Sequence, residues 1–312
     1  NPVEIKYGPY SSILVDIKDY VARVTINRPQ AYNALTIEVF KEMTDAFDKL
    51  GYDRRVAVIV LTGAGDKAFA AGADVKAINR DICTDPMGGL ALTGDFARMG
   101  NAMRTCGKPI VARCFGQIIG GGFELLIFCD LAIAAENTKF TAGEAFVGAV
   151  AIGTTQFATM VMGDKRARWL LMTDDRIDAK TALDWGIVNK VVPFDKLDEE
   201  VDKVCKTLIN KFPWAIRFTK TQLNFWHDIS STVLIQGRDF WAIHVANTAE
   251  MMEGTSAFVG QRPTQWAKFR ERDAKGIPSE YEFGPPTKQC AKCGAVHIPS
   301  DFTFCGKCGA KI

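Results

Sequence analysis

The chain has little that would direct it to a membrane or to a nucleic acid. No apolar run approaches the ~20 residues needed to span a bilayer. The chain does not open with the charged and apolar regions of a secretion signal. Its 38 basic and 36 acidic residues leave a net charge of +2, so no broad positive field is available to attract a polyanion. We therefore expect no membrane partner, no nucleic-acid partner and no secretion.

The nine cysteines do not form the framework of a disulfide-rich secreted domain. Four are grouped at the C-terminus, and an odd number is scattered through the rest of the chain. Dispersed cysteines in an enzyme-sized chain are typical of a reducing cytoplasm, so we expect a cytoplasmic protein. The scattered residues are Cys83, Cys106, Cys114, Cys129 and Cys205.

The order of apolar segments predicts an α/β core. With 312 residues the chain is long enough for one main domain and a small additional unit. A hairpin is expected over 13–26, and a helix with Thr36 as its N-cap should follow. Continuous apolar runs predict strands buried on both faces, and they alternate with helices. These strands are expected at 56–61, 110–115 and 131–135.

The C-terminal part is predicted to be helical. We expect helices over 195–210, 213–225 and about 232–253, with aromatic side chains that serve core or subunit contacts. Residues 271–289 are rich in proline, glycine and charge, which predicts a linker. The aromatic residues are Trp214, Phe218, Phe225, Trp226, Phe240 and Trp241.

Two glutamates lie on either side of a segment that begins with three glycines. Gly120–Gly122 open a predicted helix that carries Glu124, and Glu144 follows twenty residues later. Backbone N–H groups at such a helix start can hold a developing oxyanion. A pair of carboxylates can take a proton from water and deliver one to carbon. These are the parts needed to add water to an activated double bond.

Several segments in order resemble the crotonase (enoyl-CoA hydratase/isomerase) superfamily over about residues 12–270. The resemblance implies a fold of ββα repeats around a spiral core, followed by a helical oligomerisation region. It also implies a homo-oligomer, either a trimer or a hexamer. The motifs are Arg28-Pro29, Asn33–Leu35, Asp66–Lys76, Gly116–Asp130, Lys139–Glu144, Gly153–Gln156 and Ala182–Pro193.

The resemblance also implies roles for individual residues. Glu124 and Glu144 match the two catalytic carboxylates, and the N–H groups of Ala73 and Gly121 match the oxyanion hole. The substrate-binding residues that it implies are Ala71, Ala73, Asp74, Val75, Lys76, Gly120 and Gly121. Asp74 and Lys76 could face CoA, or they could equally be a helix start and a solvated cation. Arg28 and Lys67 could touch the CoA phosphates, although a surface position is their default interpretation.

Because both glutamates are present, the resemblance favours an enoyl-CoA hydratase, a lyase of fatty-acid or aromatic-acid degradation. CoA would enter as part of the substrate, and no redox cofactor is expected. The alternatives are a double-bond isomerase, a ring-opening C–C hydrolase and a non-catalytic CoA-binding scaffold. Departures from the family pattern leave the acyl group open. They are Phe115, Gly143 and the long segment Arg80–Gly100.

Two C-x-x-C-G knuckles lie at the C-terminal end of the chain, with eleven residues between Cys293 and Cys305. Each knuckle offers two thiolates to one ion, and four thiolates leave no open coordination position. We therefore predict a structural metal site of Cys290, Cys293, Cys305 and Cys308, with zinc favoured and iron as the alternative. The predicted divisions are a core at 1–195, an oligomerisation region at 196–270, a linker at 271–289 and a metal ribbon at 290–312.

Overall fold

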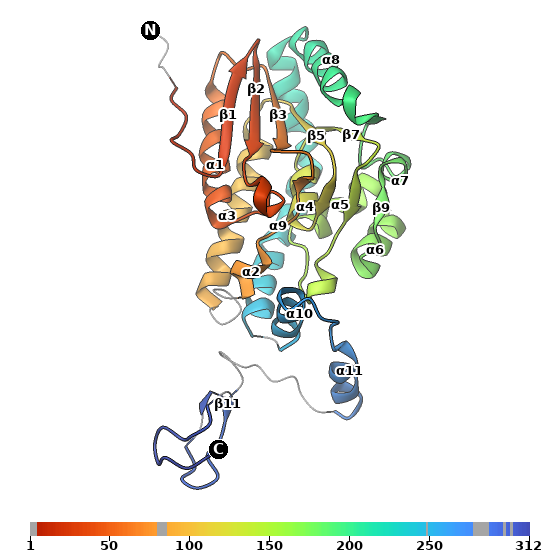
Figure 1. Ribbon diagram of the computed structural model, residues 1–312. Coiled ribbons are helices and arrows are strands. Elements are labelled where there is room, and N and C mark those ends of the chain that lie inside the picture. The colour runs from red at the N-terminus through yellow and green to blue at the C-terminus, as the bar shows by residue number, and fades with distance from the viewer. Residues whose placement is uncertain (1–4, 80–85, 248, 277–286, 296–297, 300–301) are drawn as a thin grey trace.

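The computed structural model describes residues 5–79, 86–247, 249–276, 287–295, 298–299 and 302–312 (Figure 1). It confirms the mixed α/β fold. The larger sheet has six strands, and only its first pair is antiparallel. In spatial order they are β1 (Ile13–Lys18), β2 (Val21–Ile26), β3 (Val58–Gly63), β5 (Ile110–Cys114), β7 (Leu131–Ala135) and β10 (Lys190–Val192).

A smaller sheet has four strands, and its first three each follow a strand of the larger sheet along the chain. Three of its strands are parallel, and the last one pairs antiparallel. Its spatial order is β4 (Ala68–Ala70), β6 (Gln117–Ile119), β8 (Lys139–Thr141) and β9 (Ile177–Asp178).

Three successive pairs, β3–β4, β5–β6 and β7–β8, therefore give one strand to each sheet before a helix follows, whereas β1 and β2 both join the larger sheet. This is the expected ββα pattern. The helices are α2 (Val75–Ala77) and α3 (Pro86–Thr105) after β4, α4 (Gly121–Ile127) after β6, and α5 (Thr154–Met162) after β8.

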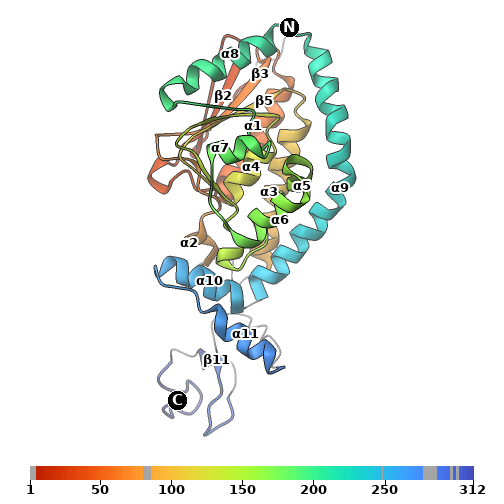
Figure 2. The ribbon, with the colours of Figure 1, turned by 90° about the vertical axis from the view of Figure 1, so that its right-hand side faces the viewer.

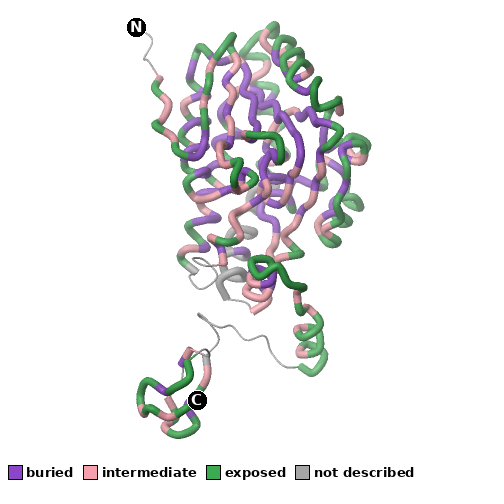
Figure 3. Tube along the Cα trace, viewed as in Figure 1, coloured by how far each residue is buried: buried purple, intermediate pink, exposed green. Residues whose placement is uncertain are grey.

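The larger sheet is buried on both faces, as its continuous apolar runs predicted (Figure 3). Val58 and Val60 of β3 pack in a cluster with Leu197 and Val201 of α8 (Leu197–Ile209). The side chains between them, such as Ile59, point to the opposite face and join the main core. That core also contains α1 (Ile37–Tyr52), whose N-cap Thr36 accepts a hydrogen bond from the Val39 amide at 3.4 Å.

One long helix crosses the back of the molecule. We predicted helices over 213–225 and about 232–253, but the structure has α9 (Pro213–Asn247) followed by α10 (Ala249–Val259). The prediction was wrong because no proline or glycine lies between Phe225 and Thr232 to end the helix. Figure 2 shows α9 running past α5 and α3 toward α10.

Shorter elements complete the core. The helices are α6 (Asp164–Thr173), α7 (Ala179–Asp184) and α11 (Trp266–Ala274), with short 3-10 turns at Pro29–Ala31, Ala145–Val147 and Phe194–Lys196. Because α11 continues to Ala274, the segment predicted as a linker begins inside a helix. Its central residues 277–286 lie outside the described part of the chain.

The cysteine-containing end of the chain forms a small hairpin of β11 (Thr287–Lys288) and β12 (Ile298–Pro299). Among the described residues, no helix is both long and apolar enough to cross a membrane.

Candidate functional site

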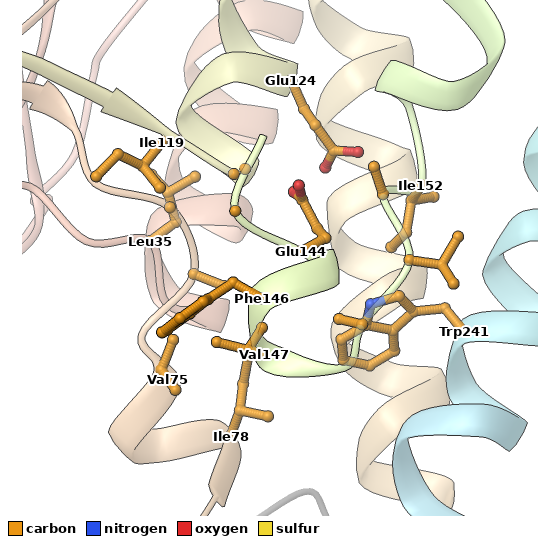
Figure 4. A pocket seen from close by; sticks show the side chains of 18 of the residues that line it. Leu35, Val75, Ile78, Ile119, Glu124, Glu144, Phe146, Val147, Ile152 and Trp241 are labelled. Atoms are coloured by element: carbon orange, nitrogen blue, oxygen red, sulfur yellow. The ribbon is translucent and has the colours of Figure 1, made fainter. Parts of the chain in front are cut away.

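A cavity of about 470 Å³ contains both predicted catalytic glutamates. It lies between the glycine turn that starts α4, the segment around the 3-10 turn Ala145–Val147, and helices α2, α3, α9 and α10 (Figure 4). Most of its wall is apolar, which suits a hydrophobic group. The apolar lining includes Leu35, Phe40, Val75, Ile78, Leu92, Phe96, Ile119, Phe146, Val147, Ile152, Trp241, Met251 and Phe258.

The glycines before Glu124 are needed for both conformation and packing. Gly120 has a φ of 52°, a left-handed conformation that glycine adopts easily. A Cβ on Gly122 would lie 2.1 Å from the carbonyl oxygen of Ala70, so only glycine lets α4 approach β4 this closely. This turn fixes the start of α4 at the cavity wall.

Two backbone N–H groups adjoin each other at this turn. Leu35 pairs with the chain around Ala73 through the Gly72 carbonyl and the Asp74 amide, which leaves the Ala73 amide outside that pairing. A Cβ on Gly121 would lie 3.6 Å from the Ala73 nitrogen, and one on Gly72 would lie 3.5 Å from the Gly121 nitrogen. Within the described residues, neither N–H has a hydrogen-bond acceptor. The predicted oxyanion pair is therefore together and available to a ligand.

Glu124 is held rigidly at the inner end of the cavity. Its side chain projects from the first turn of α4, and the residue is 4 % exposed. One carboxyl oxygen, Oε1, accepts hydrogen bonds from the amides of Gly153 at 2.6 Å and Thr154 at 3.2 Å. Burial raises the pKa of Glu124, while these backbone donors oppose the rise by favouring the ionised form.

Glu144 enters the cavity from the opposite side, and Figure 4 shows the two carboxyl groups pointing toward each other. Burial raises the pKa of Glu144 well above its ordinary value, and the nearby charges of Glu124 and Asp174 raise it further. Two facing carboxylates do not both ionise freely. Because backbone donors favour ionised Glu124, the proton of the pair is held by Glu144.

The remaining predicted substrate residues do not all face this cavity. Ala71 and Val75 line it together with Ala73, Gly120 and Gly121, but Asp74 and Lys76 do not. Asp74 caps α2 by accepting from the Ala77 amide at 3.3 Å, and it pairs with Arg28 at 3.3 Å. The exposed Lys76 lies on the surface of the same short helix.

Lys67 stacks over the ring of Tyr32 at 5.8 Å from its centre. The structure thus shows a helix-start role for Asp74 and surface positions for both lysines, and contact of any of them with CoA stays a prediction.

Sequence reasoning missed three groups at the cavity. Asp174 and Arg176 line it, although their segment reads as an ordinary polar turn. Trp241 of α9 is 6 % exposed and forms part of the wall, where we had expected core or subunit contacts. The side chain of Phe240 lies outside what the structure describes. No local sequence signal distinguishes Trp241 from the exposed aromatic residues earlier in α9.

The four C-terminal cysteines form a second candidate site. Their sulfur atoms all lie within 4.8 Å of one another. The Cys290–Cys308 and Cys293–Cys305 sulfur pairs are each separated by 3.7 Å. Four sulfurs at ~2.3 Å from a tetrahedral ion would be about 3.8 Å apart, whereas a disulfide needs about 2.05 Å. The donor set therefore fits one metal ion.

The two cysteine knuckles have the same backbone geometry. The Gly294 amide donates to the Cys290 carbonyl at 2.8 Å, and the Gly309 amide donates to the Cys305 carbonyl at the same distance. A hydrogen bond from the Cys293 amide lowers the pKa of Cys290 to about 6, and the Cys308 amide likewise lowers that of Cys305. The first cysteine of each knuckle thus favours the thiolate form that binds a metal.

Comparison with solved structures gives the same architecture. An enoyl-CoA hydratase from Mycobacterium avium subsp. paratuberculosis K-10 is 28% identical with a TM-score of 0.74, over 82% of this chain and 99% of its own. An enoyl-CoA hydratase/isomerase from Xanthobacter autotrophicus Py2 is 28% identical with a TM-score of 0.75, over 85% of this chain and 98% of its own. One from Pseudoalteromonas atlantica T6c is 26% identical with a TM-score of 0.73, over 82% and 99%.

A family model for enoyl-CoA hydratase/isomerase also matches residues 16–269, which include both glutamates and the paired N–H groups but not the cysteine knuckles. The chain therefore belongs to the enoyl-CoA hydratase/isomerase family and has its crotonase-like fold.

Proposed function

We propose that this chain is an enoyl-CoA hydratase, which adds water to an α,β-unsaturated acyl-CoA thioester. The observation that supports this most is the pair of facing glutamates in one apolar cavity, next to two adjoining N–H groups. An isomerisation needs one group to move a proton. Hydration needs a base for water and an acid for carbon, and the unequal environments of Glu124 and Glu144 supply both.

In the proposed reaction the thioester oxygen lies between the N–H groups of Ala73 and Gly121. Ionised Glu124 takes a proton from a water molecule while the water oxygen bonds to Cβ of the substrate. Negative charge then develops on the thioester oxygen. The two N–H groups stabilise that charge, and one such donor typically contributes about 3 kcal/mol. Protonated Glu144 then gives its proton to Cα. One proton passes back from Glu124 to Glu144, so the net change is addition of one water.

The apolar wall indicates the class of acyl group. Leu92 and Phe96 of α3, together with Trp241 of α9, line the same cavity as the glutamates. These residues suit a hydrocarbon chain or ring, and the CoA part would extend from the cavity mouth. A cyclic or dienoyl acyl group fits this chemistry as well as a linear one.

The proposal is tested with a panel of linear enoyl-, dienoyl- and cyclic-enoyl-CoA thioesters, followed by mass analysis. We expect a gain of one water on at least one member. An isomeric product without a mass change would support a double-bond isomerase instead. Gain of a second water with ring cleavage would support a ring-opening hydrolase. No turnover together with CoA binding would support a non-catalytic scaffold.

Variants of the two glutamates test their roles directly. Glu124→Gln and Glu144→Gln should each lower kcat by about 10²–10⁴-fold on the substrate found in the panel, because each removes a proton-transfer group. The exposed Glu136 offers a matched control, and Glu136→Gln should keep kcat within about twofold of the unaltered chain. Near-normal turnover by either active-site variant would rule out this two-glutamate mechanism.

We also propose that the cysteine cluster holds one structural zinc ion, with iron as the alternative. Its four thiolates would complete a closed tetrahedral shell, so the ion would have no open position for a substrate. A hexamer or trimer and a cytoplasmic location complete the proposal. The exposed aromatic residues of α9 support the first, and the dispersed cysteines support the second.

A further inference from the structure

We propose that Asp174 is a positioning residue that holds Glu144 in the active site by binding the backbone on both sides of it. Asp174 follows α6 and lies thirty residues after Glu144 in the chain. Its Oδ1 accepts a hydrogen bond from the Gly143 amide at 2.7 Å, and its Oδ2 accepts one from the Phe146 amide. This inference rests on the proposed role of Glu144 as the acid.

The two hydrogen bonds form a clamp around a single residue of the cavity wall. Gly143 immediately precedes Glu144, and Phe146 follows it by two residues. The Glu144 carbonyl in turn accepts from the amides of Val147 at 3.1 Å and Ala149 at 2.8 Å. The backbone of Glu144 is therefore fixed from both directions, which leaves its side chain facing Glu124 (Figure 4).

The conformation of Asp174 indicates that its carboxylate, and not merely a turn, is needed here. Its φ of 52° and ψ of 28° place it in the left-handed region, which glycine adopts more easily than a residue with a Cβ. Both of its carboxyl oxygens accept hydrogen bonds from backbone N–H groups. Its carboxylate connects the end of α6 to the segment that carries Glu144.

The negative charge of Asp174 also acts on Glu144 through space. The charged groups around Glu144 are Glu124 and Asp174, and Arg176 lines the same cavity. Removal of the Asp174 charge should lower the pKa of Glu144, because that charge is one of the causes that raise it. A substitution that only loosened the fold would not shift this titration in a defined direction.

Two variants separate the carboxylate from the turn. Asp174→Asn keeps the size of the side chain but turns one acceptor into a donor that faces an N–H group. Asp174→Gly relieves the left-handed conformation and removes both acceptors. Asp175→Asn is the matched control, since this exposed neighbour carries the same charge and its side chain binds only Trp169 Nε1, at 3.0 Å, among the described residues.

The assay uses the enoyl-CoA thioester of the panel that the unaltered chain hydrates fastest. We expect both Asp174 variants to lower kcat about 10–100-fold with KM within about threefold, because misplacing a catalytic group costs rate and not binding. The alkaline limb of the pH–rate profile should move to lower pH in Asp174→Asn. Asp175→Asn should change neither kcat nor the profile.

The outcomes distinguish this inference from the proposed function. If Glu144→Gln loses activity while Asp174→Gly and Asp174→Asn keep normal kcat and an unshifted profile, Asp174 does not position Glu144 and hydration still stands. If Glu144→Gln itself stays active, the proposed function fails first. Thermal unfolding identifies a variant that has lost its fold. If Asp174→Asn does not fold, the kcat and pH–rate profile of Asp174→Gly, whose backbone is relaxed, decide whether Asp174 positions Glu144.

Discussion

At the scale of single residues, the raised pKa of Glu144 suits its proposed role as an acid but lowers the stability of the folded chain at high pH. The pKa of Glu144 is raised in the folded chain, so the native state holds its proton more tightly than the unfolded state does. Between the unfolded pKa near 4.5 and the higher folded value, folding takes up a proton. The stabilising contribution of protonated Glu144 is thus complete below pH 4.5 and is lost as pH rises through the folded pKa.

Glu144→Gln should therefore have a much lower kcat and yet be more stable than the unaltered chain at alkaline pH. Glutamine stays neutral, so it avoids the loss that the glutamate suffers as pH rises. We expect the melting temperature to be equal at pH 4 and about 2–4 °C higher in the variant at pH 8, which corresponds to ~1 kcal/mol. Scanning calorimetry at both pH values measures this difference.

The control for this prediction is Glu136→Gln, which removes the same charge from an exposed position. Its melting temperature should follow that of the unaltered chain at both pH values. Equal stability of Glu144→Gln and the unaltered chain at pH 8 would mean that the surroundings do not raise the pKa of Glu144.

At the scale of elements, the cysteine knuckles form a unit separate from the family region, which ends at 269. Within the described part of this segment, the buried residues are Cys290, Ile298 and Cys305. So small a core cannot fold unaided, and metal binding would supply the missing free energy. The folding of this element should thus depend on its ion, while the active site should depend neither on the ion nor on the element.

Truncation after Lys275, just past α11, should remove the metal and leave kcat within about twofold. Elemental analysis should find one ion per full-length chain and none in the truncated chain. A full-length Cys290→Ser/Cys293→Ser double variant provides the control, since it loses the ion but keeps the polypeptide. A loss of activity as large as that of a glutamate variant, in an assembled truncated chain, would mean that the ribbon helps build the active site.

At the scale of the whole molecule, several large apolar side chains are exposed along the first half of α9, and contiguous exposed apolar patches often mark contact surfaces. Several of these exposed apolar residues are four or seven residues apart, so they form a stripe along one face of the helix. The exposed residues are Trp214, Phe218, Leu223, Phe225, Trp226 and Ile229, each between 56% and 67% exposed. Such a surface would suit contact with another subunit, which is the basis of the next prediction.

We predict a trimer or a hexamer at micromolar concentration, measured by light scattering. Phe218→Glu/Phe225→Glu should shift the chain to a monomer, because two charges would enter the apolar contact. Thr207→Glu adds a charge at an exposed polar position of α8, away from this stripe, and should leave the assembly intact. A monomeric unaltered chain would show that this face serves another purpose.

The sequence by itself determined the elements and the motifs whose signals are local. The Thr36 cap, the hairpin at 13–26 and the strand at 131–135 follow from spacing and residue type, and all appear as predicted. The glycine run before Glu124 and the two cysteine knuckles were equally visible, because each depends on backbone conformation within a few residues. The continuous α9 was the main error, because a polar stretch without proline or glycine does not end a helix.

Only the tertiary structure decided which distant groups share the cavity. Trp241 resembles the exposed aromatics of α9 in sequence, and its burial depends on where the helix passes α3 and α10. Asp174 sits in an ordinary polar turn, and its contact with Gly143 spans 31 residues. The proton preference of the two glutamates likewise depends on burial and on backbone donors brought from Gly153 and Thr154. Contacts of this kind leave no periodic trace, because folding alone brings their partners together.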